Sequence, residues 1–194
     1  MKKISCFKAY DVRGKVPEEL DEDIAYRIGR AYAAFVQPRT VAVGRDIRAS
    51  SPKLMDALTR GLTDSGVDVI DIGVGGTELV YFATFSRKLD GGIMVTASHN
   101  PPNYNGMKFV REESRPISAD TGLTDIRALG GRNELPAAAR QGPTRQGDIQ
   151  PDHVDHGERA HRVAEVVDHP VDGLRRGAFH QGGLGFAAAP AGGA

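Results

Sequence analysis

The sequence predicts an α/β fold: a three-layer αβα domain with a mainly parallel sheet, one antiparallel edge strand and an irregular C-terminal tail. Three observations support this prediction. Short β-prone runs alternate with helical stretches of about ten to fifteen residues, as they do in right-handed crossover units. Polar or glycine-rich loops follow three of these runs, and the alternation ends where the composition changes, beyond residue 130.

The first predicted helix spans residues 18–36. Acidic residues crowd its first turn, where the helix dipole favours them, and its apolar residues recur every three or four positions: Leu20, Ile24, Ile28, Ala31 and Phe35. A short buried strand follows at 40–46 and ends in polar residues. The next helix begins after a capping serine, has Pro52 at its first position and ends before Gly66.

The alternation continues through the second half of the domain. Residues 67–73 alternate apolar and polar side chains as a strand, residues 77–89 form a second crossover helix, and residues 91–98 form a third strand. Residues 106–110 are β-prone and follow that strand closely, so we expect them to pair antiparallel with it at the edge of the sheet. Residues 118–130 predict one more helix.

Three loops leave the carboxyl ends of the predicted parallel strands, at residues 44–51, 73–78 and 96–106. Ligands of open α/β sheets bind beyond the carboxyl ends of the strands. We therefore expect these loops to gather at one rim and to contain the functional site.

Composition excludes several classes of protein. The formal net charge is zero, so no field favours nucleic acid or an anionic membrane, and we expect neither as a partner. No apolar run is long enough to cross a bilayer, and the first residues lack the apolar core of a signal peptide. Cys6 is the single cysteine, and one free thiol fits a reducing compartment. These observations favour a cytoplasmic protein.

The chain divides at a change of composition. All seven lysines, eight serines and five tyrosines lie at or before residue 118, whereas five of the six histidines lie beyond residue 130, without the spacing of a metal site. We predict a domain at 1–140 and a poorly ordered tail at 141–194, because the tail buries too little apolar surface to offset its ordering entropy. Such a composition is typical of a GC-rich gene translated out of frame, which leads to the hypothesis of a frameshifted end.

Two loops approach common motifs without matching them. In residues 73–78 the dinucleotide fingerprint G-x-G-x-x-G would need glycine where Glu78 stands, so a tight strand-to-helix turn is the better interpretation. Ser98 and His99 are adjacent, and adjacent residues seldom direct their side chains at each other. No G-x-S-x-G elbow surrounds Ser98 either, so a serine hydrolase is disfavoured.

The loop at 96–106 combines a hydroxyl, an imidazole and carboxamides, and Lys108 follows it. Arg45 and Arg13 are expected near the same rim, with an aspartate able to brace Arg13. Taken alone, these charges are also explained as solvated ion pairs or as a charged turn. Together they suit phosphate, because arginine and lysine offset its charge and serine can carry a phosphoryl group covalently.

Three motifs stand in a familiar order: "FKAYDVRG" at 7–14, "GRDIR" at 44–48, and "TASHNP" followed by "YNGMK" at 96–108. In these motifs the chain resembles the α-D-phosphohexomutases, most of all the bacterial phosphomannomutase/phosphoglucomutase branch. The last motif matches the phosphoserine loop of that family. The resemblance covers residues 1 to about 130, which correspond to the first of the family's four domains.

This resemblance implies an intramolecular phosphotransfer on a hexose phosphate of the mannose or glucose series. Ser98 would carry the phosphoryl group, and mannose 6-phosphate and mannose 1-phosphate would interconvert through a hexose bisphosphate intermediate. Mg²⁺ would bind one oxygen of the Ser98 phosphate, and hexose 1,6-bisphosphate would act as the activator.

The resemblance also assigns roles to other residues. Four are implied to be catalytic, with Lys108 also a candidate for proton transfer: Ser98, His99, Lys108 and Arg13. Four are implied to bind substrate or phosphate, or to support the serine: Tyr10, Asn100, Arg45 and Asp46.

Motifs of the later family domains are missing from this chain. The Asp-Gly-Asp-x-Asp-Arg carboxylates do not occur, although hard Mg²⁺ needs such oxygen ligands, and the Gly-Glu-x-Ser-x-His sugar loop is also absent. Residues 148–156 only faintly resemble the entry to the second domain. We therefore expect a truncated mutase that is weakly active or inactive. The alternative is a non-catalytic module that binds phosphate or a sugar phosphate.

Overall fold

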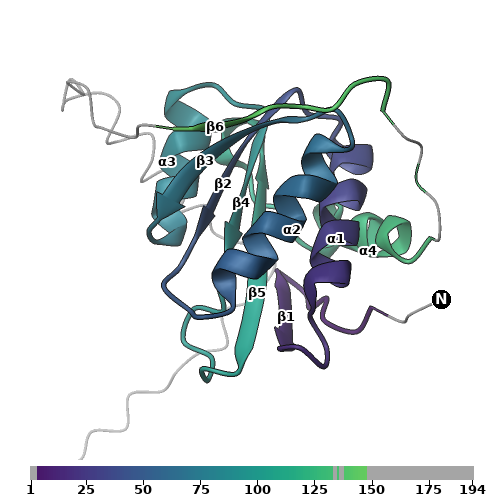
Figure 1. Ribbon diagram of the computed structural model, residues 1–194, viewed down its shortest axis with the longest axis vertical. Coiled ribbons are helices and arrows are strands. Elements are labelled where there is room, and N and C mark those ends of the chain that lie inside the picture. Colours follow the sequence, from purple (N-terminus) through teal and green to yellow (C-terminus); the bar gives the residue numbers. More distant parts are fainter. Residues whose placement is uncertain (1–3, 133–134, 136–137, 148–194) are drawn as a thin grey trace, which may run out of the picture.

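The structure is a computed structural model that describes residues 4–132, 135 and 138–147 (Figure 1). The faint likeness at 148–156 and the hypothesis of a frameshifted end fall on residues outside this part of the chain.

A six-stranded sheet forms the middle layer, in the order β1-β5-β4-β2-β3-β6. The strands are β1 (Val12–Lys15), β2 (Thr40–Arg45), β3 (Asp68–Val74), β4 (Gly91–Val95), β5 (Tyr104–Arg111) and β6 (Thr144–Gln146). β2 pairs in parallel with β3 and β4, and β3 pairs in parallel with β6. β5 runs antiparallel to both of its neighbours, β4 and β1. The mainly parallel sheet with an antiparallel edge is thus confirmed.

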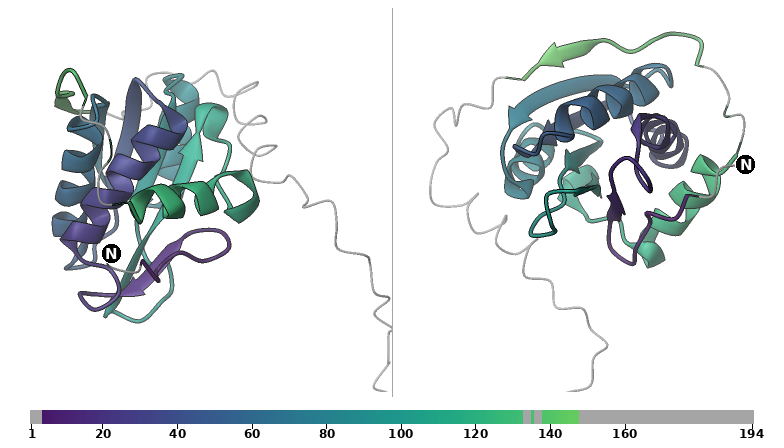
Figure 2. Two further views of the ribbon diagram at one scale, coloured as in Figure 1. Left: turned by 90° about the vertical axis from the view of Figure 1, so that its right-hand side faces the viewer. Right: turned by 60° about the horizontal axis from the view of Figure 1, so that its bottom comes forward.

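Helices cover both faces of the sheet (Figures 1 and 2). They are α1 (Glu22–Val36), α2 (Ser51–Thr63), α3 (Thr77–Ser86) and α4 (Leu123–Gly130). The alternation of side chains along β2 shows the two cores, because Val41 and Val43 face the core of α1 and α2, whereas Ala42 faces that of α3. α4 lies beside α1, so the three-layer αβα prediction is confirmed.

Two glycines explain how closely α1 and α2 approach. A Cβ on Gly29 would lie 2.4 Å from the carbonyl oxygen of Leu58, and one on Gly61 would lie 2.2 Å from that of Tyr26. Any larger residue at either position would push the helices apart. The packing therefore depends on two small residues that face each other across the helix pair.

The N-termini of α1 and α2 differ from the prediction. α1 begins at Glu22 rather than at 18, because the carboxylate of Asp21 accepts the backbone N–H of Ile24 at 2.9 Å and caps the helix there. Ser50 occupies the N-cap position of α2, but its side chain makes no capping hydrogen bond. Its hydroxyl instead accepts a hydrogen bond from Asn105 at 2.8 Å, so a tertiary contact has replaced the local one.

Two strands were not predicted. β1 lies in the segment interpreted above as a charged turn, and it is only four residues long, too short to show a period. It pairs antiparallel with β5 on the outer side, so β1 and not β5 is the last strand at this edge of the sheet. β6 is three exposed residues within the range assigned to the tail, and it extends the sheet beyond residue 140. The predicted helix at 118–130 is divided at Gly122, whose φ is 132°.

Candidate functional site

The loops that follow β2, β3 and β4 meet at one rim of the sheet, as expected. The backbone N–H of Asp46 donates to the carbonyl of Val95 at 3.0 Å, and that of Gly75 donates to the carbonyl of Arg45 at 2.9 Å. The rim therefore joins the loop after β2 to both of its neighbours. We call residues 96–103, which connect β4 to β5, the serine loop.

Ser98 adopts an unusual backbone conformation in the serine loop. Its φ is 53°, in the left-handed region that a non-glycine residue adopts only where its surroundings hold it. Its N–H donates to Thr96 Oγ1 at 2.9 Å, and the N–H and side-chain amide of Asn100 both donate to the carbonyl of Ala97, at 3.0 and 2.9 Å. Ala97 is buried while Ser98 is exposed, so the loop presents the serine hydroxyl to solvent.

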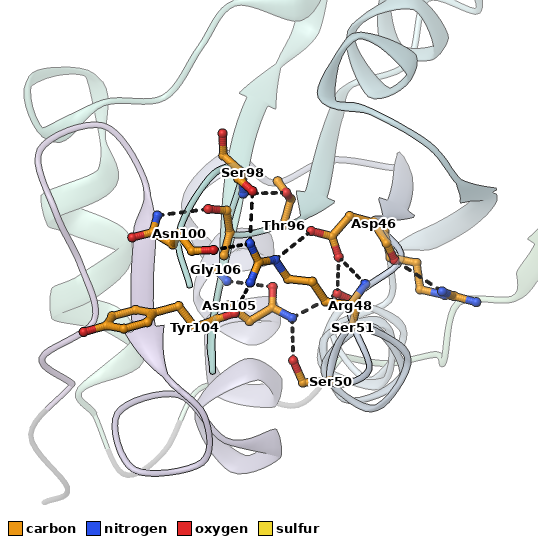
Figure 3. A network of polar contacts seen from close by, with 12 residues as sticks. Asp46, Arg48, Ser50, Ser51, Thr96, Ser98, Asn100, Tyr104, Asn105 and Gly106 are labelled. Atoms are coloured by element: carbon orange, nitrogen blue, oxygen red, sulfur yellow. Dashed lines mark hydrogen bonds and ion pairs between the residues drawn. The ribbon is translucent and has the colours of Figure 1, made fainter. Parts of the chain in front are cut away.

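Arg48 holds the serine loop from the side of α2 (Figure 3). Its Nη2 donates to the carbonyl oxygens of Ser98 and Asn100, at 3.0 and 2.6 Å. Its Nη1 donates to those of Pro101 and Tyr104, at 2.7 and 3.1 Å. One guanidinium thus gathers four carbonyl groups of the loop and of the strand that follows it.

Arg48 is itself held by the residues around it. Asp46 lies 3.4 Å from Arg48 Nε and accepts hydrogen bonds from the Arg48 N–H at 3.0 Å and from Ser51 Oγ at 2.5 Å. The fully buried Asn105 donates to the hydroxyls of Ser50 and Ser51, at 2.8 and 2.9 Å (Figure 3). We call Asp46, Arg48, Ser50, Ser51 and Asn105 the arginine clamp. It unites the loop after β2, the start of α2 and the start of β5.

Asp11 gathers two cations on the β1 side of the serine loop. Arg13 Nε and Nη2 each lie 2.9 Å from Asp11 Oδ2, and Lys108 Nζ lies 3.8 Å from the same oxygen. Arg13 Nη1 also donates to the carbonyl of Thr96 at 3.2 Å, at the beginning of the serine loop. We call Asp11, Arg13 and Lys108 the Asp11 cluster. Asp11 braces Arg13 as the sequence suggested.

The remaining residues that the sequence indicated lie at the surface. Ser98 Oγ and His99 Nδ1 are 3.3 Å apart, so the expectation that these neighbours point away from each other is wrong. His99 has no carboxylate partner in the part of the chain that the structure describes. Tyr10 is 72% exposed, and Arg45 donates only to the adjacent carbonyl of Asp46, at 3.3 Å. Neither makes a hydrogen bond to the serine loop within the described residues.

Sequence reasoning missed Arg48 and Asn105 as site residues. Arg48 belongs to "GRDIR", but the motif does not say which carbonyls an arginine will bind. Asn105 has no sequence signal beyond its place in "YNGMK".

Cys6 lies beneath this region, and its backbone carbonyl accepts a hydrogen bond from the Arg13 N–H at 2.6 Å. Burial raises the pKa of its thiol to about 11, so it is no nucleophile at neutral pH.

The described residues do not form a magnesium site by themselves. No group of three or more His, Cys, Asp or Glu side chains in residues 4–132, 135 and 138–147 is arranged to hold a metal ion. A phosphate on Ser98 would supply one oxygen ligand, and the Asp-Gly-Asp-x-Asp-Arg carboxylates are missing from the sequence. The residues present therefore do not fit a complete Mg²⁺ shell.

Among the described helices none is long and apolar enough to cross a membrane.

Comparisons with known proteins agree with the motifs. The family model described as phosphoglucomutase/phosphomannomutase, alpha/beta/alpha domain I, matches residues 5–133. A phosphomannomutase of Escherichia coli is 58% identical over 158 residues, which are 80% of this chain and 35% of that protein. A phosphomannomutase of Klebsiella pneumoniae is 57% identical over 157 residues, 80% of this chain and 100% of that sequence.

A solved structure shows the same fold. The crystal structure of a phosphoglucomutase/phosphomannomutase family protein from Burkholderia thailandensis superposes with a TM-score of 0.69 at 38% identity, over 77% of this chain and 34% of that one. The chain thus spans about a third of the length of the E. coli and Burkholderia relatives. It belongs to the phosphoglucomutase/phosphomannomutase family, with residues 5–133 as its α/β/α domain I.

Proposed function

We propose that this chain carries the phosphoserine site of a phosphohexose mutase, with Ser98 as the residue that accepts and returns the phosphoryl group. The observation that supports this most is the presentation of Ser98. Its hydroxyl is exposed on a left-handed residue in a loop held from both sides, and two cations lie on one of those sides. Phosphoryl transfer depends mainly on such positioning and on charge neutralisation.

The proposed step transfers one phosphoryl group from a hexose 1,6-bisphosphate to Ser98. Ser98 Oγ bonds to phosphorus, the bond between phosphorus and the sugar oxygen breaks, and the sugar oxygen ends as a hydroxyl. His99 Nδ1, 3.3 Å from Ser98 Oγ, accepts the serine proton in the tautomer that leaves Nδ1 unprotonated. Lys108 donates the proton that the sugar oxygen gains, while Arg13 offsets the charge of the phosphoryl oxygens.

We extend the proposal to mannose 6-phosphate and mannose 1-phosphate as the interconverted pair, with Mg²⁺ as the metal and hexose 1,6-bisphosphate as the activator. The relatives named phosphomannomutase support this extension. Since the described residues lack a complete magnesium shell, we route no step through the metal. For the same reason the chain by itself is expected to turn over slowly or not at all.

A second candidate is a module that binds phosphate or a sugar phosphate without reacting. The Asp11 cluster favours it, because Arg13 and Lys108 can bind an anion whether or not Ser98 is phosphorylated. The two candidates differ in one observable, the formation of a covalent bond to Ser98.

The test is to incubate the chain with glucose 1,6-bisphosphate or mannose 1,6-bisphosphate and to measure its intact mass. Phosphoserine formation predicts the gain of one phosphoryl group, located at Ser98 by peptide mapping. Ser98→Ala should abolish this gain. Ser86→Ala should not, because that hydroxyl bonds to the carbonyl of Phe82 on α3. Saturable binding without any mass gain would instead support the binding module.

A further inference from the structure

We propose that Arg48 is a positioning residue for the phosphoryl transfer, whose guanidinium holds the serine loop in the conformation that presents Ser98 Oγ to the donor. The inference rests on the proposed function of Ser98. It concerns a residue that binds neither donor nor phosphate and that acts only through the backbone of the loop.

The contacts of Arg48 within the described residues leave no free N–H group on Nη1 or Nη2 for a ligand. A guanidinium has five N–H groups. The two on Nη2 are matched by the carbonyls of Ser98 and Asn100, and the two on Nη1 by those of Pro101 and Tyr104. The fifth, on Nε, faces the Asp46 carboxylate at 3.4 Å. To bind a phosphate, Arg48 would have to release part of the loop.

The carbonyl groups that Arg48 binds are the ones that determine the orientation of Ser98. Nη2 holds the carbonyl of Ser98 itself and that of Asn100, so the peptide bonds that follow Ser98 and Asn100 are held together. Ser98 has a φ of 53°, a conformation that persists only when surrounding contacts maintain it. Two hydrogen bonds of the Ser98 backbone maintain it: Arg48 donates to the Ser98 carbonyl, and the Ser98 N–H donates to Thr96 Oγ1.

The clamp needs the planar fork of arginine. Four carbonyls are bound by two nitrogens in one plane, and a lysine ammonium has three donors on a single atom. Asp46 fixes the plane, since its carboxylate contacts Nε while it accepts the hydroxyl of Ser51 at the start of α2. A lysine at position 48 would keep the charge and most of the volume but would lose the geometry.

The neighbouring arginine serves as a contrast. Arg45 lies three residues earlier and donates only to the carbonyl of Asp46 among the described residues. Its remaining donors are available to a ligand, whereas those of Arg48 are not. Within the "GRDIR" motif the geometry therefore separates an arginine that can face substrate from one that shapes the loop.

The experiment measures single-turnover phosphorylation of Ser98 by glucose 1,6-bisphosphate in the full chain, in Arg48→Lys and in Arg48→Met. Hydrogen exchange of the peptide covering 96–104 is measured in parallel. We expect the maximal rate to fall about 100-fold in Arg48→Lys, the size of loss that a displacement of about 1 Å produces. The half-saturating donor concentration should stay within about twofold, because Arg48 does not touch the donor. Exchange in 96–104 should become faster, while peptides from β2 and α1 should not change.

Arg60→Lys is the matched control, because Arg60 is an exposed arginine near the other end of α2, and both measurements should stay at wild-type values. A raised half-saturating concentration with an unchanged maximal rate would overturn the proposal, since Arg48 would then bind the donor. Unchanged exchange in 96–104 would overturn it as well. If Arg48→Met does not fold, Arg48→Lys alone decides. If the wild-type chain takes up no phosphate, the proposed function fails, and hydrogen exchange alone judges whether Arg48 holds the loop.

Discussion

The serine loop is flanked by two regions, each with a partly buried arginine, and the two arginines use their N–H groups differently. The arginine clamp lies on the α2 side of the loop, and the Asp11 cluster lies on the β1 side. Burial does not distinguish their arginines, since the side chains of Arg48 and Arg13 are 15% and 12% exposed. What distinguishes them is the number of N–H groups that the protein already occupies.

Within the described residues, Arg48 donates four hydrogen bonds from Nη1 and Nη2 and its Nε lies in an ion pair with Asp46. Arg13 has acceptors for three N–H groups there, two of them on the same oxygen of Asp11. Lys108 lies 3.8 Å from that oxygen, beyond hydrogen-bonding distance, and its side chain is 31% exposed. The Asp11 cluster therefore retains donors for a ligand, and the arginine clamp does not. Of the two arginines beside this loop, Arg48 therefore shapes the loop, whereas Arg13 can also contact a ligand.

Replacing Arg13 should give the largest effect on chemistry. Arg13→Met keeps the length of the side chain but removes the charge, and we expect phosphorylation of Ser98 to slow about 100- to 1000-fold, as when one charge-stabilising donor is lost. Arg27→Met is the control, because Arg27 is similarly buried and, within the described residues, its one ion pair is with Asp23, four residues earlier on α1, at 3.7 Å. Equal losses of rate in Arg13→Met and in Arg27→Met would contradict the division between the two regions.

Replacing Asn105 should give the largest effect on stability. Asn105→Ala removes two donors from the serine hydroxyls of α2 and the acceptor of the Gly106 N–H, all in a buried position. We expect the free energy of unfolding in urea to fall by about 2–3 kcal/mol. Asn103→Ala, at an exposed position of the serine loop two residues earlier, should change it by less than about 0.5 kcal/mol. Similar losses in both variants would show that the clamp adds nothing special.

Alkaline pH should weaken the anchoring of β1, which carries Arg13. Burial raises the pKa of the Cys6 thiol from 9.0 to about 11. The unfolded chain therefore loses this proton first, so the contribution of Cys6 is complete below pH 9 and is lost as the pH rises towards 11. Relative to Cys6→Ala, the wild type should lose about 1.4 kcal/mol of unfolding free energy between neutral pH and pH 10. Parallel pH profiles for the two proteins would contradict this.

Replacing Arg45 should give the smallest effect on stability. Its single described hydrogen bond goes to the adjacent carbonyl of Asp46, so Arg45→Ala should change the urea midpoint by an amount equivalent to less than about 0.5 kcal/mol. Arg48→Ala, measured beside it, should lower the midpoint clearly. If both variants lost stability equally, the donors of Arg48 would be no more important to the fold than those of Arg45.

Much of the architecture could be predicted from local pattern. The period of α1 and the buried runs of β2 and β4 predicted the layers, because each element must bury an apolar face. The short outer strands could not be predicted. β1 has four residues, and β6 has three exposed ones, so their pairing depends on the β5 and β3 backbones and not on their own periodicity.

The sequence by itself determined the family and the residue types of the candidate site: a serine, an imidazole and cations at the rim beyond the strands. Only the tertiary structure decided how these groups are used. The partners of Arg48 lie about fifty residues away along the chain, and those of Asn105 lie as far in the other direction. Contacts between residues so far apart leave no local pattern in the sequence. They arise because the sheet brings the ends of β2, β4 and β5 together, and only then can one arginine be saturated while another keeps donors for a ligand.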